Sequence, residues 1–496
     1  MIYTWYELCL SIYIFSQVIQ MSTSFDPQKQ ISGAPPSTIS VLGQRIQVYM
    51  AHMKTGRFLN WRKRLSWILL IVFFGTPWLM FSGLPVVKID AIGRKLIFLG
   101  HYYFPTELPT FIPLLFAVII GAFAVTSTLG RIFCGWICPQ TVFLQFVFAP
   151  IERWIEGPAH KRREAHAGPM TFVRARRLIL KHLLFAVFAF LVANTVLAYF
   201  WGVNDVLTAM TTPPAENPFA FGMMLFVNGL FYFIYAHFKE QACVIMCPYA
   251  RFQSVLADAQ TLQVGYDYNR GEGEKGRAKP ALRKAAPEVD YGDCIDCGQC
   301  TRVCPTGIDI RNGVQLECVG CARCADACDT IMDTIKKPRG LVRYTQQNAL
   351  ECKTNTQVLK PRFWIYASIV MICLSVFVYL QMNRSLMTVD MIRQSGTPYL
   401  KDQAGLIVNP YLMKIRNKDV VDHNFTIQAS IPGVLAHFDQ EKVNIMGAEI
   451  KETIVTLRAP ESLFKSGQLE FELLIKSEKE VYRKKIRMVG PYHLAK

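Results

Sequence analysis

Eight cysteines between residues 294 and 328 constrain the fold of this chain more than any other feature. They read Cys294-x2-Cys297-x2-Cys300-x3-Cys304-Pro305, followed by Cys318-x2-Cys321-x2-Cys324-x3-Cys328-Asp329. A run with this spacing holds a cubane iron–sulfur cluster in bacterial electron carriers, and here the run occurs twice, with Asp329 in place of the second proline. The fold must therefore arrange these thiols around two 4Fe–4S clusters, and the chain is expected to carry electrons.

Two other uses of clustered cysteines fit the spacing less well. Structural zinc sites use two ligand pairs rather than three ligands followed by a fourth, and a disulfide framework needs an oxidising compartment. In two-cluster ferredoxins the fourth cysteine of each run ligates the other cluster. We therefore expect one cluster on Cys294, Cys297, Cys300 and Cys328, and the second on Cys318, Cys321, Cys324 and Cys304.

The composition indicates a membrane protein with soluble insertions. Of the 496 residues, 51% are hydrophobic and only 18% are charged, which is more apolar than an ordinary soluble protein. The formal net charge is +17. No nucleic-acid-binding motif is present, so no nucleic-acid partner is expected, and the basic excess is interpreted as cytoplasmic loops.

Five stretches are long and apolar enough to span a bilayer as helices. They lie at 65–84, 111–127, 178–201, 221–238 and 363–380. Basic residues precede the first stretch and crowd the loop between the second and third, whereas 202–220 has no lysine or arginine. Because positive loops stay in the cytoplasm, the N-terminus and the eight cysteines are predicted inside and the C-terminus outside.

A second cysteine motif occurs twice, as Cys134-x3-Cys138-Pro139 and Cys243-x3-Cys247-Pro248. Both copies are predicted at the cytoplasmic ends of spans, where residues four apart on a helix would present two thiols on one face. Thiolates suit monovalent copper or iron–sulfur clusters. These four cysteines are therefore the candidate catalytic and copper-binding residues, with a third metal centre, a redox-active disulfide or buried structural cysteines as alternatives.

Other residues carry weaker signals. Met246, His237 and His101 are more consistent with packing than with copper ligation, and Cys352 and Cys373 are interpreted as structural. The sequence 271–276 matches GxGxxG, but no apolar strand precedes it and no apolar helix follows, so a dinucleotide site is not expected. Residues 1–20 contain Glu7 and lack a basic n-region, which makes them a poor signal peptide, and Cys9 within them is taken as incidental.

The last part of the chain changes character. After the fifth span, β-forming segments at 411–415, 424–431, 450–457 and 469–475 alternate with turn residues, which we take to include Pro410, Pro460 and Gly467. This pattern predicts a small β-sandwich of about 100 residues. Because it contains no cysteine and no catalytic cluster, docking or structure is its expected role.

Together these motifs resemble the CcoG/FixG family, also called RdxA, of cytochrome c oxidase accessory proteins. The resemblance is carried by 134–139, 243–248, the eight-cysteine segment and the β-domain after the fifth span. It implies reduction of Cu(II) to Cu(I) during assembly of cbb3-type cytochrome c oxidase, and an immunoglobulin-like C-terminal domain. It also implies assembly factors and copper carriers as partners, in the bacterial inner membrane.

The predicted fold is an α-helical membrane protein of five transmembrane helices, with an inserted ferredoxin-like domain for two 4Fe–4S clusters and a C-terminal immunoglobulin-like β-sandwich. Its parts are a cytoplasmic segment 1–63, a four-helix membrane region 64–265, a cytoplasmic linker and ferredoxin-like domain 266–360, a fifth transmembrane helix 361–381 and a periplasmic domain 382–496.

The functional hypothesis is a membrane-bound cupric reductase that takes electrons from a cytoplasmic donor, which the sequence does not identify. One alternative is a quinol-linked subunit resembling NapH, whose pattern lacks the β-domain. The other is a copper-holding scaffold that is not an enzyme.

Overall fold

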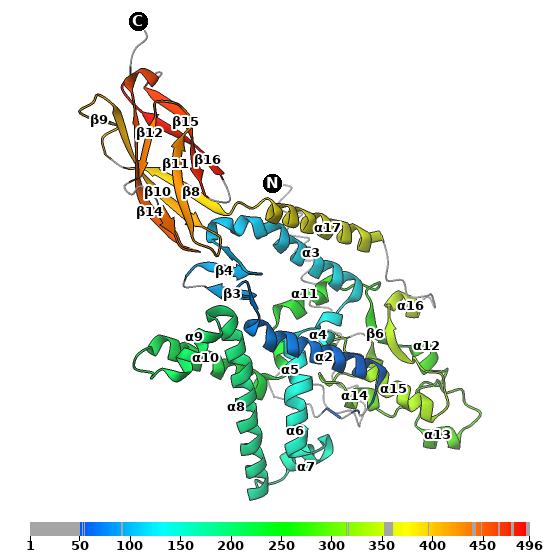
Figure 1. Cartoon of the computed structure of the whole chain (residues 1–496). Helices are drawn as coiled ribbons and strands as arrows, with labels where there is room; N and C mark the ends of the chain where they lie inside the picture. Colours follow the sequence, from blue (N-terminus) through cyan, green and yellow to red (C-terminus); the bar gives the residue numbers. More distant parts are fainter. Residues whose placement is uncertain are drawn as a thin grey trace, which may run out of the picture. The chain divides into compact units, whose positions relative to one another are not determined.

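The computed structural model in Figure 1 describes residues 50–492, apart from 52, 54, 91–92, 314, 316, 352–360, 395, 439–442, 448, 465–466 and 478–480. The chain divides into two compact units. The first comprises Met1–Ser66, Val125–Leu183 and Phe238–Val358, and the second comprises Trp67–Ala124, Leu184–His237 and Leu359–Lys496. Both copies of the Cys-x3-Cys-Pro motif and all eight clustered cysteines belong to the first unit. The interpretations of residues 1–20, including Cys9, and of Cys352 concern residues outside those described.

Five helices of the described chain are long and apolar enough to cross a membrane, judged by length and composition. They are Pro105–Leu129, Ile132–Glu156, Phe172–Trp201, Pro218–Phe238 and Pro361–Met382. Four of them overlap predicted spans. The expected architecture of five membrane helices, iron–sulfur region and β-sandwich is thus confirmed, but one span is not the one that the sequence predicted.

The bounds of the first span, predicted at 65–84, are wrong. Helix α2 covers Arg57–Gly75, so it begins in the basic segment and ends well before residue 84. Pro77 follows in a short 3₁₀ turn, and β1 (Met80–Phe81) then pairs with β2 (Leu84–Pro85). Ser82 and Gly83 both have positive φ, 52° and 80°, as a tight hairpin turn requires. Hydropathy alone does not detect this turn.

The candidate span Ile132–Glu156 was assigned to a loop by the sequence prediction. It consists of α4 (Ile132–Trp136), α5 (Pro139–Phe143), a π-helical turn Leu144–Phe148 and α6 (Ala149–Glu156). Cys138 between α4 and α5 has φ −55° and ψ 123°, which is not helical. The sequence prediction missed this apolar segment because Pro139 and Glu152 interrupt it.

The remaining helices are those of the other four candidate spans and the shorter ones between them. Their bounds are α3 (Ile112–Leu129), α7 (Ala159–Ala167), α8 (Phe172–Trp201), α9 (Val203–Thr211), α10 (Pro218–Phe233), α11 (Pro248–Leu256), α12 (Tyr268–Gly271), α13 (Pro280–Ala285), α16 (Gln347–Glu351) and α17 (Pro361–Met382). A three-stranded antiparallel sheet of β3 (Val87–Asp90), β4 (Lys95–Phe98) and β5 (His101–Tyr103) precedes α3.

The cysteine-rich region is a small folded core. Antiparallel strands β6 (Gln263–Tyr266) and β7 (Val342–Thr345) bracket it, and it contains the helices α14 (Gln299–Arg302) and α15 (Arg323–Thr334). Its buried residues are Val264, Tyr266, Cys294, Cys300, Ile310, Ala322, Ala325, Met332, Leu341 and Val342. Cysteines thus form part of the hydrophobic core itself, as expected where a cofactor replaces side chains at the centre of a small domain.

Helix α2 is attached to this region at its first turn. The backbone N–H groups of Phe58 and Leu59 donate to the carboxylate of Asp326 on α15, at 3.0 and 2.8 Å. The first N–H groups of a helix have no partner within the helix, so a carboxylate placed there both caps them and complements the helix dipole. The start of α2 is therefore fixed by a residue far away in sequence.

The C-terminal domain is a β-sandwich. One sheet has the order β12-β14-β10-β8 with β9 on β10, and the other has the order β13-β11-β15-β16. The strands are β8 (Met387–Arg393), β9 (Leu400–Lys401), β10 (Ile407–Asn417), β11 (His423–Ala429), β12 (Leu435–Phe438), β13 (Val443–Ile445), β14 (Ile450–Ala459), β15 (Gln468–Lys476) and β16 (Val481–Val489). Every second residue of β10 is buried, which is the alternation that a half-buried strand produces.

Pro410 does not interrupt a strand, contrary to the sequence interpretation. It lies inside β10 and pairs with Thr456 of β14. On the other side of β10, pairing with β8 begins at Tyr411 and pairing with β9 ends at Val408. Pro410 therefore falls in the gap between two partner strands, where its missing N–H costs no ladder hydrogen bond.

A buried ionic group joins the β-sandwich to the segment before α3 within the second unit. The carboxylate of Glu107 accepts hydrogen bonds from Arg384 at 3.0 and 2.9 Å, and Lys418 lies 2.7 Å away. The three side chains are 5 to 11% exposed. Because two buried cations share one carboxylate, neither can lose it without a large desolvation penalty.

Candidate functional site

The structure gathers the eight clustered cysteines into two separate pockets. The first pocket is lined by Cys294, Cys297, Cys300 and Cys328, together with residues that include Tyr266, Arg311 and Met332. The second pocket is lined by Cys304, Cys318, Cys321 and Cys324, together with apolar residues that include Ile308, Ile310 and Val319, and Cys300 at its edge. The fourth cysteine of each run therefore lies with the first three of the other run.

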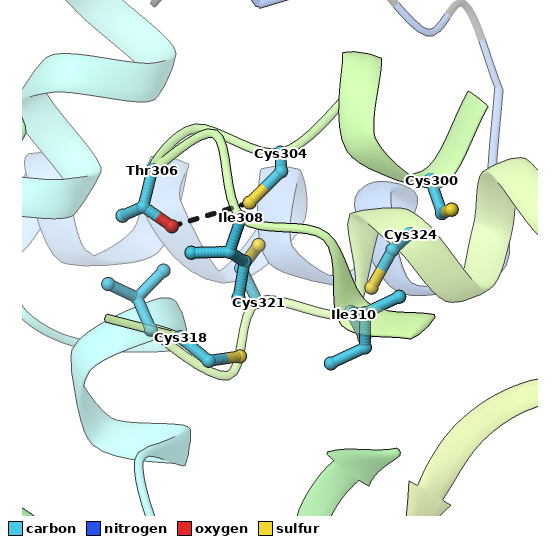
Figure 2. Close-up of a pocket in the computed structure, with 10 residues that line it drawn as sticks. Cys300, Cys304, Thr306, Ile308, Ile310, Cys318, Cys321 and Cys324 are labelled. Carbon is cyan, nitrogen blue, oxygen red and sulfur yellow. Dashed lines mark hydrogen bonds between the residues drawn. The ribbon is translucent and has the colours of Figure 1, made fainter. Parts of the chain in front are cut away.

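Figure 2 shows the second pocket. The sulfurs of Cys304, Cys318, Cys321 and Cys324 are directed toward one shared space, whereas the sulfur of Cys300 turns away from it. The Thr306 hydroxyl lies 3.3 Å from the Cys304 sulfur. A neighbouring hydroxyl can donate to a ligating thiolate, and such hydrogen bonds help set the reduction potential of a cluster.

Burial and neighbouring thiols raise the pKa of a clustered cysteine in each pocket. The pKa of Cys328 is raised to about 12, first by burial and then by the nearby thiols of Cys300, Cys294 and Cys297. Burial also raises the pKa of Cys324 well above its usual value, and the nearby thiols of Cys318, Cys321, Cys304 and Cys300 raise it further. A raised pKa means that the thiolate form is disfavoured unless a positive charge lies beside it. Iron binds the deprotonated thiol, so bound iron would supply that charge.

The backbone of the two runs repeats as well. The residue before the second cysteine of each run is left-handed, with φ 49° at Asp296 and 64° at Gly320, and so is the residue after it, with φ 65° at Gly298 and 54° at Ala322. Gly298 and Ala322 are the N-cap residues of α14 and α15. Each run thus makes the same turn into a helix that carries its third cysteine, Cys300 on α14 and Cys324 on α15.

The residues fit iron–sulfur clusters better than single metal ions. No group of three or more His, Cys, Asp or Glu side chains in the described chain is placed to hold one ion. A cubane occupies a volume between its ligands, so its thiols surround a space and do not converge on a point. In the first pocket the Tyr266 hydroxyl lies beside Cys294: burial raises the pKa of Tyr266, and the charge of Cys294 and a hydrogen-bond contact with it raise that pKa further. That hydroxyl is a ready donor to a sulfur of a bound cluster.

The two Cys-x3-Cys-Pro motifs share one local structure. In each, the N–H of the second cysteine donates to the residue five positions earlier, from Cys138 to Phe133 and from Cys247 to Ala242, both at 2.9 Å. The second cysteine is then the N-cap of the next helix, α5 or α11, whose first residue is the proline. Proline at the first position of a helix is favourable because no N–H is needed there.

The sequence argument that each motif presents two thiols on one helical face is therefore wrong in detail. The second cysteine of each motif lies outside the helix that carries the first, because its ψ is 123° at Cys138 and 113° at Cys247. The proline forces this, since it disfavours helical geometry in the residue before it. The motif is a helix end followed at once by a helix start.

The structure nevertheless brings the four thiols into one region, which we call the four-thiol site. The Cys134 sulfur donates to Gln253 Oε1 of α11 at 3.2 Å, and Arg131 donates to the carbonyl of Ala250 on α11 at 2.7 Å. The pKa of Cys243 is raised to about 12 by burial first, and also by Cys138, Cys134 and Cys247. The first motif thus packs against the helix that follows the second.

A buried donor without a partner accompanies these thiols. Gln253 is 1% exposed, and its Nε2 makes no hydrogen bond, although its Oε1 accepts from Cys134. By contrast, His237 stacks on Phe233 at 5.3 Å, Met246 is 59% exposed and His101 is exposed in β5. Cys373 lies partly buried on α17.

Sequence reasoning missed the residues that connect the two kinds of site. Gln253, Gly135, Trp136 and Tyr344 carry no metal-ligand signal, and only their contacts reveal them. The one sequence hint is that Gly135 and Trp136 lie inside the first Cys-x3-Cys-Pro motif.

Three family models match the chain. A "4Fe-4S dicluster domain" covers residues 238–347, a "4Fe-4S binding domain" covers residues 111–158, and the "IG-like fold at C-terminal of FixG" covers residues 377–491. The first includes the second Cys-x3-Cys-Pro motif and all eight clustered cysteines. The second includes the other copy of that motif.

Curated relatives agree with these models. The nitrogen fixation protein FixG of Rhizobium meliloti is 33% identical over 298 residues, which is 58% of this chain and 55% of FixG. Protein RdxA of Cereibacter sphaeroides is 34% identical over 56% of this chain and 59% of its own length. Protein RdxB of the same organism is 30% identical over 416 residues, 80% of this chain and 85% of RdxB.

Among solved structures, the FixG-related protein from Vibrio parahaemolyticus is similar to 22% of this chain and 98% of its own, at 14% identity and a TM-score of 0.20. That score is too low to support an argument about the fold. The extended match to RdxB and the FixG C-terminal domain are sufficient without it: the chain belongs to the FixG/RdxA family of iron–sulfur membrane proteins.

Proposed function

We propose that this protein is a membrane-bound electron-transfer protein that reduces Cu(II) to Cu(I) at the four-thiol site. Cu(II) gains one electron and becomes Cu(I), and a reduced protein in the cytoplasm supplies that electron. The observation that carries the proposal is that both Cys-x3-Cys-Pro motifs and both cysteine pockets lie in one compact unit. Two pairs of thiols, which are soft ligands that suit Cu(I), thus lie in the same compact unit as the two cysteine pockets.

We propose that Cys294, Cys297, Cys300 and Cys328 hold one 4Fe–4S cluster, and that Cys304, Cys318, Cys321 and Cys324 hold the other. Such clusters, when bound, supply reversible one-electron storage. The grouping of the thiols in two pockets supports this division. The buried Tyr266 hydroxyl and the left-handed turns around each second cysteine support it further.

The four-thiol site favours the reduced form of copper. Thiolate ligands prefer Cu(I) to the harder Cu(II), so binding the product there draws the reduction forward. Cys138 and Cys247 each lie at the N-cap of the helix that follows, α5 or α11. Gln253 Nε2 is a buried donor that can bond to a thiolate once copper has displaced the thiol proton.

The proposal includes a location and a biological role. The pockets face the cytoplasm of a bacterial inner membrane, the β-sandwich lies in the periplasm, and the copper is supplied to a cbb3-type cytochrome c oxidase through assembly factors and copper carriers. The asymmetric distribution of basic residues between the loops supports the orientation, and the family resemblance supports the role.

A direct assay separates this function from its alternatives. The full-length protein, loaded with clusters, is reduced without oxygen, and Cu(II) is added together with a chelator that absorbs light only when it binds Cu(I). We expect Cu(I) to appear as the clusters become oxidised. A copper-holding scaffold would leave the clusters reduced, and a quinol-linked subunit would be oxidised by a quinone analogue but not by Cu(II).

A further inference from the structure

The four-thiol site touches the second cysteine pocket through backbone, without intervening side chains. Gly135 lies between Cys134 and Trp136 in α4, and a Cβ atom added to it would stand 2.6 Å from the carbonyl oxygen of Val319 and 2.9 Å from the backbone N of Cys321. These distances are shorter than real Cβ contacts. Helix α4 therefore rests directly on the loop that carries two cysteines of the second pocket.

A second glycine, on the cysteine loop, makes a similarly close contact with the residues beside α4. Gly320 has φ +64°, and a Cβ added to it would stand 3.0 Å from the carbonyl oxygen of Arg131. Glycine at both positions allows two backbone segments to approach more closely than any other residue would. Gly320, one of the two residues between Cys318 and Cys321, thus lies against Arg131, three residues before Cys134.

A chain of two hydrogen bonds holds this approach. Trp136 Nε1 donates to the Tyr344 hydroxyl at 2.9 Å, and that hydroxyl donates to the carbonyl of Gly320 at 2.6 Å. Phe58 packs edge-on against both rings, at centroid distances of 6.4 and 5.3 Å. Tyr344 is therefore fixed between the motif on α4 and the cysteine loop.

The first pocket has different neighbours. It is bounded by Tyr266, Leu341 and Val342 and by residues of α15. None of the contacts described above for Cys134, Gly135 and Trp136 reaches a residue that lines it. The contacts described above therefore connect the four-thiol site to the second pocket and not to the first.

We propose that the pocket of Cys304, Cys318, Cys321 and Cys324 is the one directly coupled to the four-thiol site, and that Trp136 and Tyr344 are the positioning residues that maintain this coupling. The inference rests on the proposed function, because the coupling is taken to serve electron transfer to the four thiols. The first pocket is then the one nearer the electron donor.

The test uses the full-length, cluster-loaded protein and measures the reduction equilibrium of each cluster by low-temperature electron paramagnetic resonance. Cys294→Ser and Cys304→Ser variants assign each signal to its pocket. Anaerobic addition of Cu(I) is expected to change the reduction constant of the second-pocket cluster at least about threefold, which is about 28 mV for a one-electron couple, and to leave the other unchanged.

Tyr344→Phe and Tyr266→Phe form a matched pair, since each removes one hydroxyl beside one pocket. Tyr344→Phe should shift the second-pocket signal alone and reduce its response to Cu(I) by at least about half, because the link to Gly320 is lost. Tyr266→Phe should shift the first-pocket signal alone and leave the response to Cu(I) intact. Trp136→Phe keeps the ring contact and provides a second variant if Tyr344→Phe loses iron.

Equal responses of both clusters to Cu(I), or a response that survives Tyr344→Phe and Trp136→Phe unchanged, would overturn the coupling. The outcome is independent of copper reduction itself. A protein that fails to reduce Cu(II) but shows the selective response retains the coupling and refutes the proposed function. A protein that reduces Cu(II) but shows equal responses of the two clusters retains the proposed function and refutes the coupling.

Discussion

Gly135→Ala is the substitution with the sharpest structural expectation. In an open helix, replacing glycine by alanine stabilises the folded state by about 1 kcal/mol. Here the new methyl would stand 2.6 to 2.9 Å from the backbone of Val319 and Cys321, and backbone atoms cannot rotate away as a side chain can. Overpacking of this kind costs about 1–3 kcal/mol.

Gly222→Ala is the matched control, because Gly222 is also helical, on α10, and its added Cβ would meet nothing within 4 Å. The gain in helix propensity is common to both variants and cancels in their comparison. Gly135→Ala should therefore be less stable than Gly222→Ala by about 2 kcal/mol.

The assay is the rate at which iron passes from the protein to a ferrous chelator in mild denaturant. The clash destabilises the native contact between α4 and the cysteine loop, and it is relieved when that loop moves away from α4 and releases iron. The barrier to iron release is therefore lower by about 2 kcal/mol, and release should be roughly thirtyfold faster. About half of the iron should follow the fast rate, because only the second pocket is disturbed. Equal rates for the two alanine variants would refute the close contact between α4 and the cysteine loop.

Three further predictions follow from contacts of single residues. Asp326→Ala removes the cap of α2 and should lower stability by about 1 kcal/mol, seen as a lower midpoint of thermal unfolding; an unchanged midpoint would mean that water replaces the cap. Glu107→Ala leaves Arg384 and Lys418 buried without a carboxylate, and should destabilise their surroundings by about 3–5 kcal/mol, which limited proteolysis near residue 384 would report as faster cleavage. Cys304→Ser should lower the iron content by about half and remove one paramagnetic signal, whereas loss of both signals would show that the two pockets do not fill independently.

The grouping of the clustered cysteines could be predicted from the sequence because ligand spacing is local information. The exchange of fourth cysteines between runs follows from a spacing rule, and Cys304 and Cys328 indeed lie with the opposite runs. The β-sandwich was also predictable, since strand alternation and turn residues persist over the whole domain. Ile415 and Leu473, both fully buried, lie in segments that the sequence predicts as strands.

What could not be predicted depended on contacts between distant segments. The end of the span predicted at 65–84 was wrong because hydropathy does not reveal the turn at Ser82 and Gly83. The apolar segment Ile132–Glu156 was missed because a proline and a charged residue interrupt it. The link from Trp136 through Tyr344 to Gly320 joins three segments, and no periodicity or motif connects them.

The central claim is that an electron reaches Cu(II) at the four-thiol site, and one rapid-mixing measurement tests it most directly. Reduced full-length protein and its Cys138→Ser/Cys247→Ser variant are each mixed with Cu(II), and the loss of cluster reduction and the formation of Cu(I) are followed together. The account predicts that each Cu(I) formed in the native protein matches one electron lost from the clusters, while the variant keeps its iron and sulfide content but reacts at least about tenfold more slowly. Equal rates in the two proteins, or clusters that stay reduced, would contradict the account.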